Sequence, residues 1–294
     1  MAEQPALRTR PAWVDDDLFP FRSRFVEVDG HTVHYVDEGT GPVLLLLHGN
    51  PTWSFLWRDV ITALRADFRC IALDYPGFGL SSPAPGYRFL PEEHAGVVAG
   101  FADALGLDGV TLVGQDWGGP IGLAVARRRP EVFERLVLAN TWAWPVNGDL
   151  YFEFFSRIGG SSPLRFLARR LNLVVNAFVP TGHRRRKVTA AEMAHYRQAQ
   201  ATPARRQAAA VLPSRITASR SFLAEVESGL AGLSHLPLLI VWGGADRVFR
   251  PQERERLEAS FPDHTTVIVE GAGLYVESDA PEEFAAAVRG WLTS

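Results

Sequence analysis

Six short apolar runs constrain the fold of this chain more than any other feature of its sequence. They are VLLLLHG (43–49), FRCIALD (68–74), VTLVGQD (110–116), RLVLANT (135–141), PLLIVWG (237–243) and TTVIVEG (265–271). Each run is strand-sized and ends in or near a glycine, aspartate or asparagine. Runs of this kind are typical of strands that are buried on both faces of a mostly parallel sheet.

The segments around these runs indicate the rest of the sheet and its covering layers. Residues 25–37 alternate apolar and polar side chains around Asp29-Gly30, which predicts an antiparallel hairpin at the start of the chain. Helical patterns are found between the runs, at 54–64, 91–105, 119–128, 252–260 and 281–291. We therefore predict an α/β fold: an eight-stranded, mostly parallel, doubly wound sheet with helices on both faces.

The alternation of strands and helices stops between residues 142 and 216. Four helical patterns follow one another there without a clear strand, at 150–158, 163–178, 190–200 and 204–212. We interpret residues 142–216 as a helical cap inserted after the sixth strand, and residues 1–141 and 217–294 as the core. The basic run Arg184 to Lys187 in this insertion is interpreted as a solvated loop.

Composition narrows the classes of partner. Thirty basic residues against 33 acidic ones give a formal charge of -3, which offers no electrostatic case for nucleic acid or for a membrane. The single cysteine, Cys70, excludes an internal disulfide framework, and the first residues show no apolar secretory signal. We therefore expect a cytoplasmic protein that binds small molecules, with a monomer as the default state.

The segment Gly114-Gln115-Asp116-Trp117-Gly118 carries the most specific chemical signal. It joins an apolar strand to a helical pattern, as a nucleophile elbow does, although a glycine-rich loop after a strand can also be a simple turn. Its place after the fifth strand favours the elbow. Asp116 is a carboxylate that is already ionised at pH 7, so it can displace a leaving group from an sp3 carbon without a base. Alkyl halides and epoxides are the natural substrates, and both give an alkyl ester of Asp116.

A second motif, His48-Gly49-Asn50-Pro51, follows the third strand. In this architecture, the backbone amides of Asn50 and Trp117 are expected to form the oxyanion hole. Their side chains offer an amide N–H and an indole N–H, which suit a departing halide. Asn50 could instead be a turn residue and Trp117 a core residue, but their joint placement beside Asp116 favours halide binding.

These motifs resemble the haloalkane dehalogenase family of the α/β-hydrolase superfamily. The resemblance lies in HGNPTWSFLWR (48–58), DYPGFGLSS (74–82), GQDWGG (114–119) and GGADRVF (243–249), and it extends from about Phe19 to the C-terminus. It implies the α/β-hydrolase fold, Asp116 as nucleophile and Asn50 with Trp117 as the halide pair. It also implies a small apolar halogenated substrate, a halide ion and water as partners, and no cofactor or metal.

The resemblance further implies an acid that orients a catalytic histidine. Asp246 is the candidate, because the other position known for this acid reads Ala139-Asn140-Thr141-Trp142 and contains no carboxylate. The chain then resembles the branch of the family with an aspartate acid and an Asn-Trp halide site. A loop aspartate such as Asp246 can also be a simple turn former.

The chain departs from the family at the position of the catalytic base. The stretch after the eighth strand reads Glu270-Gly271-Ala272-Gly273-Leu274-Tyr275, with leucine where the family has histidine, and none of the eight histidines is an obvious substitute. Loss of a general base typically costs roughly 100- to 10,000-fold in rate. We therefore expect Asp116 to be alkylated and its ester to persist. Leu274 fits natural divergence and an engineered trap equally well.

Two other functions remain open on the sequence alone. An epoxide hydrolase shares the aspartate elbow and uses cap tyrosines, for which Tyr151 and Tyr196 are candidates. A catalytically silent small-molecule binder is the second alternative, since Leu274 removes the base. The substrate pocket depends on cap side chains whose orientation the sequence does not give; the candidates are Phe152, Phe155, Phe166 and Phe178.

Overall fold

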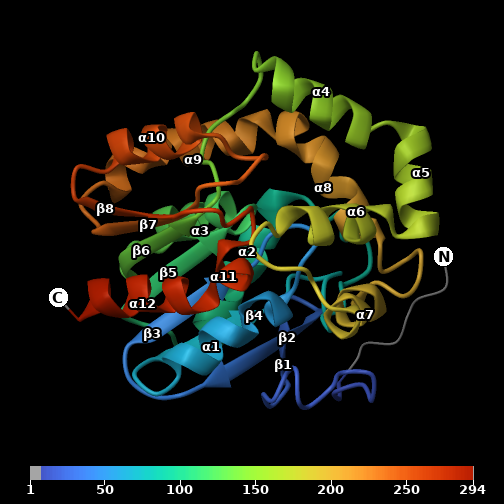
Figure 1. The fold of residues 1–294 in the computed structure, drawn as a ribbon, viewed down its shortest axis with the longest axis horizontal. Helices are drawn as coiled ribbons and strands as arrows, with labels where there is room; N and C mark the ends of the chain where they lie inside the picture. The colour runs from blue at the N-terminus through green and yellow to red at the C-terminus, as the bar shows by residue number, and fades with distance from the viewer. Residues whose placement is uncertain (1–7, 294) are drawn as a thin grey trace.

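The computed structural model describes residues 8–293, which form an eight-stranded sheet with the order β1-β2-β4-β3-β5-β6-β7-β8 (Figure 1). The strands are β1 (Arg24–Val28), β2 (His31–Glu38), β3 (Val43–Leu47), β4 (Arg69–Leu73), β5 (Val110–Gln115), β6 (Phe133–Ala139), β7 (Leu238–Gly243) and β8 (His264–Val269). β1 pairs with β2 and β2 with β4 in antiparallel fashion, while the other pairs are parallel. The predicted fold class is therefore confirmed.

The opening hairpin has the turn that its sequence predicts. Val28 pairs with His31 across the turn, and the two turn residues have positive φ, 49° at Asp29 and 79° at Gly30. Two successive residues with positive φ match the twist of the flanking strands, which is why Asp-Gly is favoured there.

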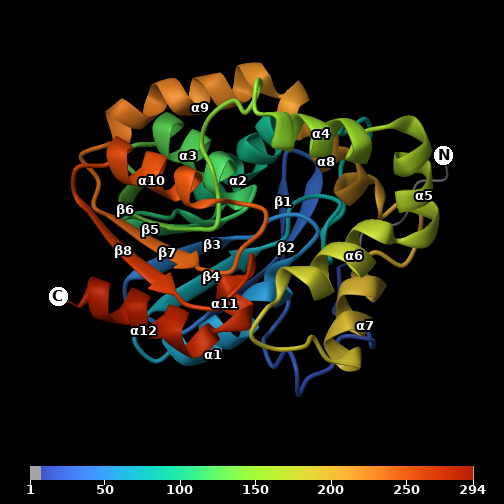
Figure 2. The same cartoon turned by 45° about the horizontal axis from the view of Figure 1, so that its top comes forward.

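Helices cover both faces of the sheet. They are α1 (Arg58–Leu64), preceded by a 3-10 turn at Ser54–Trp57, α2 (Pro91–Leu105), α3 (Gly118–Arg128), α9 (Arg220–Leu233), α10 (Pro251–Ser260), α11 (Val276–Asp279) and α12 (Pro281–Leu292). Figure 2 shows α2, α3 and α9 on one face and α1, α11 and α12 on the other. Every side chain of β5 and β7 is buried as a result, which accounts for the unbroken apolar runs in those strands.

Five consecutive helices follow β6 and lie together at one end of the molecule (Figure 1). They are α4 (Leu150–Gly159), α5 (Ser162–Leu171), α6 (Leu173–Gly182), α7 (Ala190–Ala199) and α8 (Gln207–Ala218). The chain then returns through α9, which packs against α3 of the core. The division into a core and a cap at residues 142–216 stays a prediction. Within residues 8–293, no helix combines the length and apolar character needed to cross a bilayer.

Two helical expectations differ from the structure. The pattern at 163–178 predicts one helix, but Asn172 has a φ of 53° and separates α5 from α6, because asparagine tolerates the left-handed conformation that ends a helix. α9 was not predicted. The basic run at 184–187 is anchored: the backbone amides of Arg184 and Arg185 donate to Asp279.

Candidate active site

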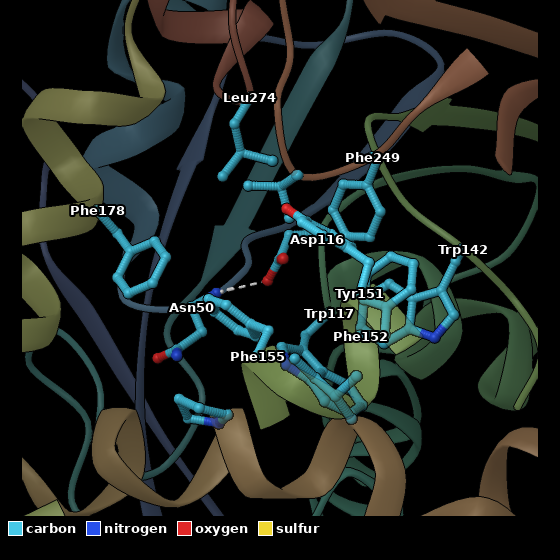
Figure 3. Close-up of a pocket in the computed structure, with 13 residues that line it drawn as sticks. Asn50, Asp116, Trp117, Trp142, Tyr151, Phe152, Phe155, Phe178, Phe249 and Leu274 are labelled. Atoms are coloured by element: carbon cyan, nitrogen blue, oxygen red, sulfur yellow. Dashed lines mark hydrogen bonds between the residues drawn. The ribbon is translucent and has the colours of Figure 1, made fainter. Parts of the chain in front are cut away.

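Asp116 lies on the sharp turn between β5 and α3. Its φ of 50° is in the left-handed region, which non-glycine residues rarely adopt. The turn also requires glycine nearby, since a Cβ on Gly118 would lie 2.2 Å from the carbonyl oxygen of Leu47. The side chain of Asp116 points into a pocket below the helical insertion (Figure 3).

Two backbone amides hold the Asp116 carboxylate. The N–H of Asn50 donates to its Oδ1 at 2.8 Å, and the N–H of Trp117 is a second backbone donor. A Cβ on Gly49 would lie 2.3 Å from the Cβ of Asp116, so glycine at position 49 lets the loop approach the carboxylate. These donors have the identity that the sequence predicts for an oxyanion hole.

The electrostatics of Asp116 reflect its burial. Burial raises the pKa of this carboxyl from its ordinary 3.8 to about 7, although the amides of Asn50 and Trp117 act in the opposite direction. The nearby carboxylate of Asp246 contributes to the increase. Near neutral pH, the side chain is therefore divided between the neutral acid and the nucleophilic carboxylate.

The pocket around Asp116 is small and mostly apolar. Its volume is about 40 Å³, which is room for about three water molecules. Strand-end loops and the helices α4, α6 and α8 contribute to its wall, which consists of Asn50, Asp116, Trp117, Trp142, Tyr151, Phe152, Phe155, Phe178, Pro213, Ile216, Val248, Phe249 and Leu274. A site of this size and polarity suits a small uncharged molecule.

The candidate cap residues divide into those that line the pocket and those that do not. Phe152, Phe155 and Phe178 line it, whereas Phe166 lies on α5 and is exposed, so the expectation for Phe166 is wrong. The helical spacing of Phe166 in the sequence is typical of a buried residue, but in the structure α5 presents this side chain to solvent. Of the two cap tyrosines, Tyr151 lines the pocket and Tyr196 is buried elsewhere.

Three N–H groups are candidates for holding a halide beside Asp116. Nδ2 of Asn50 donates to the carbonyl oxygen of Ala209 at 3.3 Å, which leaves its second hydrogen available. The Trp117 and Trp142 rings are in edge contact, with centroids 4.7 Å apart. Nε1 of Trp142 is buried and has no hydrogen-bond partner among residues 8–293. Trp142 could not be identified as a donor from the sequence, because its only signal there is its place just after β6.

Leu274 lines the same pocket as Asp116 and is 4% exposed. Figure 3 places its side chain on the side of Asp116 opposite to Trp117. Its backbone carbonyl accepts a hydrogen bond from Nε2 of Gln115 at 3.2 Å. The side chain is a hydrocarbon and cannot accept a proton.

No histidine within residues 8–293 lines this pocket. His183, beside Tyr275, has both ring nitrogens engaged, by the carbonyl of Val179 and the hydroxyl of Ser278. His48 accepts from the N–H of Tyr75 and donates to the carbonyl of Gly49. Burial lowers the pKa of both imidazoles to about 4. These two histidines therefore have structural roles in this conformation.

Asp246 follows β7 but does not line the pocket. Its carboxylate accepts hydrogen bonds from Nδ2 of Asn140 at 2.8 Å and from the N–H of Val248 at 2.7 Å. Oδ1 of Asn140 in turn accepts from the N–H of Gly243 at 2.8 Å. Burial raises the pKa of Asp246 to about 6 despite these donors. In the sequence, position 140 was notable only because it does not hold the acid. In the structure, the amide of Asn140 orients Asp246.

A further buried acid, Glu277, lies three residues after Leu274. Glu277 is fully buried, and neither carboxyl oxygen has a hydrogen-bond partner within the described chain. Burial raises the pKa of Glu277 well above its ordinary value, with a further contribution from Asp116. Glu277 gives no signal in the sequence, because Glu277-Ser278-Asp279 resembles an ordinary polar helix start.

Comparisons with known proteins identify the family of this chain. The family model of the alpha/beta hydrolase fold matches residues 42–276. The chain belongs to the α/β-hydrolase family. It is 46% identical over 276 residues to haloalkane dehalogenase 2 of Mycobacterium tuberculosis, which covers 93% of this chain and 96% of that protein. The chain is thus a haloalkane dehalogenase-like hydrolase.

Two more distant relatives place this hydrolase in a wider group. It is 28% identical to the cis-3-alkyl-4-alkyloxetan-2-one decarboxylase of Shewanella oneidensis, over 95% of this chain and 90% of that protein. Among solved structures, an ancestral haloalkane dehalogenase is 28% identical, with a TM-score of 0.82 over 92% of this chain and 98% of that one. The fold is therefore shared with proteins of more than one named activity.

Proposed function

We propose that this hydrolase cleaves the carbon–halogen bond of small apolar haloalkanes by attack of Asp116, and that the alkyl-aspartyl ester then accumulates. The observation that carries the proposal is the joint presence of Asp116 and Leu274 in one mostly apolar pocket. The first supplies a nucleophile for displacement, and the second removes the base that hydrolysis needs. The residues 142–216 act as a cap in this proposal, since Tyr151 to Phe178 and Pro213 to Ile216 provide much of the pocket wall.

The first half-reaction requires only groups that this pocket contains. An oxygen of the Asp116 carboxylate forms a bond to the halogen-bearing carbon, and the electrons of the carbon–halogen bond leave with the halide. The negative charge thus passes from the carboxylate to the halide, where the N–H groups of Asn50 and Trp117, together with Trp142, stabilise it. The mostly apolar wall of the pocket strengthens these interactions.

The second half-reaction lacks one group. Water must add to the ester carbonyl of Asp116, and the amides of Asn50 and Trp117 are placed to hold the resulting oxyanion. The attacking water must also lose a proton, which Leu274 cannot accept. Asp246 is set back from the pocket and hydrogen-bonded to Asn140, so without an imidazole between them it does not reach that water.

The alternatives have less support. An epoxide hydrolase of this type uses a pair of cap tyrosines, but Tyr196 is outside the pocket and the hydroxyl of Tyr151 donates to the carbonyl of Arg247 at 2.7 Å. A silent binder would take up a haloalkane reversibly and would bind it equally well after Asp116→Asn. The electrostatics of Asp116 do not favour a silent binder. With a pKa of about 7, this side chain still forms the ionised carboxylate that attacks a haloalkane near neutral pH.

The test is the covalent state of the protein after incubation with 1-bromobutane. Intact mass spectrometry is expected to show one added butyl group per chain, and peptide mapping is expected to place it on Asp116. The Asp116→Asn variant keeps the size of the side chain but is not a carboxylate nucleophile, so it should show no adduct. An equal adduct on that variant, or none on the parent, would refute the proposal.

A further inference from the structure

Large apolar side chains that face solvent are concentrated on two neighbouring helices. Eight such side chains are exposed in residues 8–293, and seven lie on α4 or α5. Besides Tyr151 at the pocket, they are Leu150, Phe154, Ile158, Phe166, Leu167 and Leu171. Leu150 is 81% exposed and Phe154 69%. Single exposed apolar residues are ordinary, but a concentration of them marks an interaction surface.

The exposed apolar side chains of α4 lie on a different side of the helix from those that line the pocket. Phe152 and Phe155 on one side of α4 line the pocket. Leu150, Phe154 and Ile158 follow one another at intervals of four residues and form a separate exposed stripe. Figure 1 shows α4 and α5 at the outer edge of the helical insertion. We call the surface made by the six exposed residues named above the α4–α5 face.

Positive charge accompanies this apolar surface. α4 and α5 contain four arginines, at positions 157, 165, 169 and 170, and one acidic residue, Glu153. The guanidinium of Arg170 lies over the ring of Phe166, 5.3 Å from its centroid. Helices that combine leucine and phenylalanine with arginine are typical of segments that lie in the interface of a membrane.

A groove beside α5 extends the positive charge. It has a volume of about 840 Å³, and its wall includes five arginines and no acidic residue. Arg165, Arg169, Arg205 and Arg215 are four of them, and the fifth, Arg88, is paired with a glutamate. Neither Arg165 nor Arg215 has an ion-pair or hydrogen-bond partner for its guanidinium in the described part of the chain. Arginine is well suited to phosphate oxygens, so this groove fits a phosphate headgroup.

We propose that the α4–α5 face docks peripherally on an anionic membrane surface, with its apolar side chains in the interfacial layer and its arginines on lipid phosphates. A second copy of the chain fits less well, because a two-fold pairing through this face would bring eight arginines together with only two glutamates. The net charge of -3 gives no indication of this surface, since net charge does not report how charges are distributed.

Vesicle sedimentation of the full chain tests the proposal. Vesicles of equimolar phosphatidylcholine and phosphatidylglycerol should bind the protein more strongly than vesicles of phosphatidylcholine alone. The double variant F154S/F166S should bind the anionic vesicles at least ten-fold more weakly. Ile268→Ser is the matched control, because Ile268 on β8 is the eighth exposed side chain, at 42%, and lies outside the face. It should bind like the parent.

Two further measurements test the contribution of the arginines to vesicle binding and the folding of the variants. R165Q/R169Q should weaken anionic-vesicle binding by about five-fold for each charge removed. Thermal melting should show that all three variants remain folded, since the substituted side chains are at least partly exposed. Failure of the parent to bind anionic vesicles at low salt would overturn the proposal, as would unchanged binding by F154S/F166S. Concentration-dependent dimerisation without vesicle binding would assign the face to a second copy instead.

Discussion

Replacing Asp116 by asparagine should stabilise the protein, and the gain should grow with pH. Burial raises the pKa of Asp116 from 3.8 to about 7. The unfolded chain therefore ionises this carboxyl at a lower pH than the folded protein does, and the parent loses stability as pH rises through that window. One pKa unit corresponds to about 1.4 kcal/mol, so the full difference corresponds to about 4 kcal/mol in the free energy of unfolding. Structural relaxation around the charge makes this an upper estimate.

Urea unfolding of Asp116→Asn and of the parent at several pH values between 4 and 8 measures this effect. The two proteins should differ little at pH 4, and the variant should be more stable by up to about 4 kcal/mol at pH 8. The pKa of Glu277 is raised in part by Asp116, so its titration contributes to the difference in the same direction. Asp108→Asn, which changes an exposed aspartate before β5, should show no such trend. A difference that is the same at every pH would refute the assignment of the raised pKa to Asp116.

Four further predictions concern the reaction. Leu274→His should restore turnover by roughly 100- to 10,000-fold, seen as steady bromide release; a variant that still stops after one turnover would show that other parts of the site have also drifted. The alkylation rate of the parent should rise between pH 6 and pH 8 and then level off, because burial raises the pKa of Asp116 to about 7; a rate independent of pH in single-turnover assays would contradict this. Trp142→Phe should slow alkylation by about ten-fold through loss of one N–H donor, and an unchanged rate would exclude Trp142 as a halide donor. In the Leu274→His background, Asn140→Ala should lower turnover at least several-fold, because Asp246 loses the amide that orients it; equal turnover would mean that Asn140 has no positioning role.

The strands of the sheet could be predicted because each one is indicated by a short continuous stretch of sequence. The six apolar runs correspond to β3 through β8, and Asp29-Gly30 forms the turn of the opening hairpin. α9 was missed because it follows the cap helices without a strand between them. The division of 163–178 into two helices depends on one residue, Asn172, whose side chain gives no strong signal by itself.

The site could be predicted only where residues are adjacent to a motif. Asp116, Asn50 and Trp117 lie beside glycines that the elbow and the loop after β3 require, and Leu274 was found by its place after β8. Trp142 was missed as a candidate because its place beside the pocket depends on which loops meet above the sheet, and the positions of Asn140 and Glu277 depend on it in the same way. Phe166 was assigned wrongly, since the direction in which a cap helix faces is set by tertiary packing.

The most direct test of the account is the number of bromide ions released per protein molecule when the parent is mixed with excess 1-bromobutane. We expect a burst that stops at about one bromide per chain while the butyl ester remains on the protein, because Leu274 cannot activate water. Continued release of many bromides per chain would show that another group serves as the base, and would contradict the central role given to position 274.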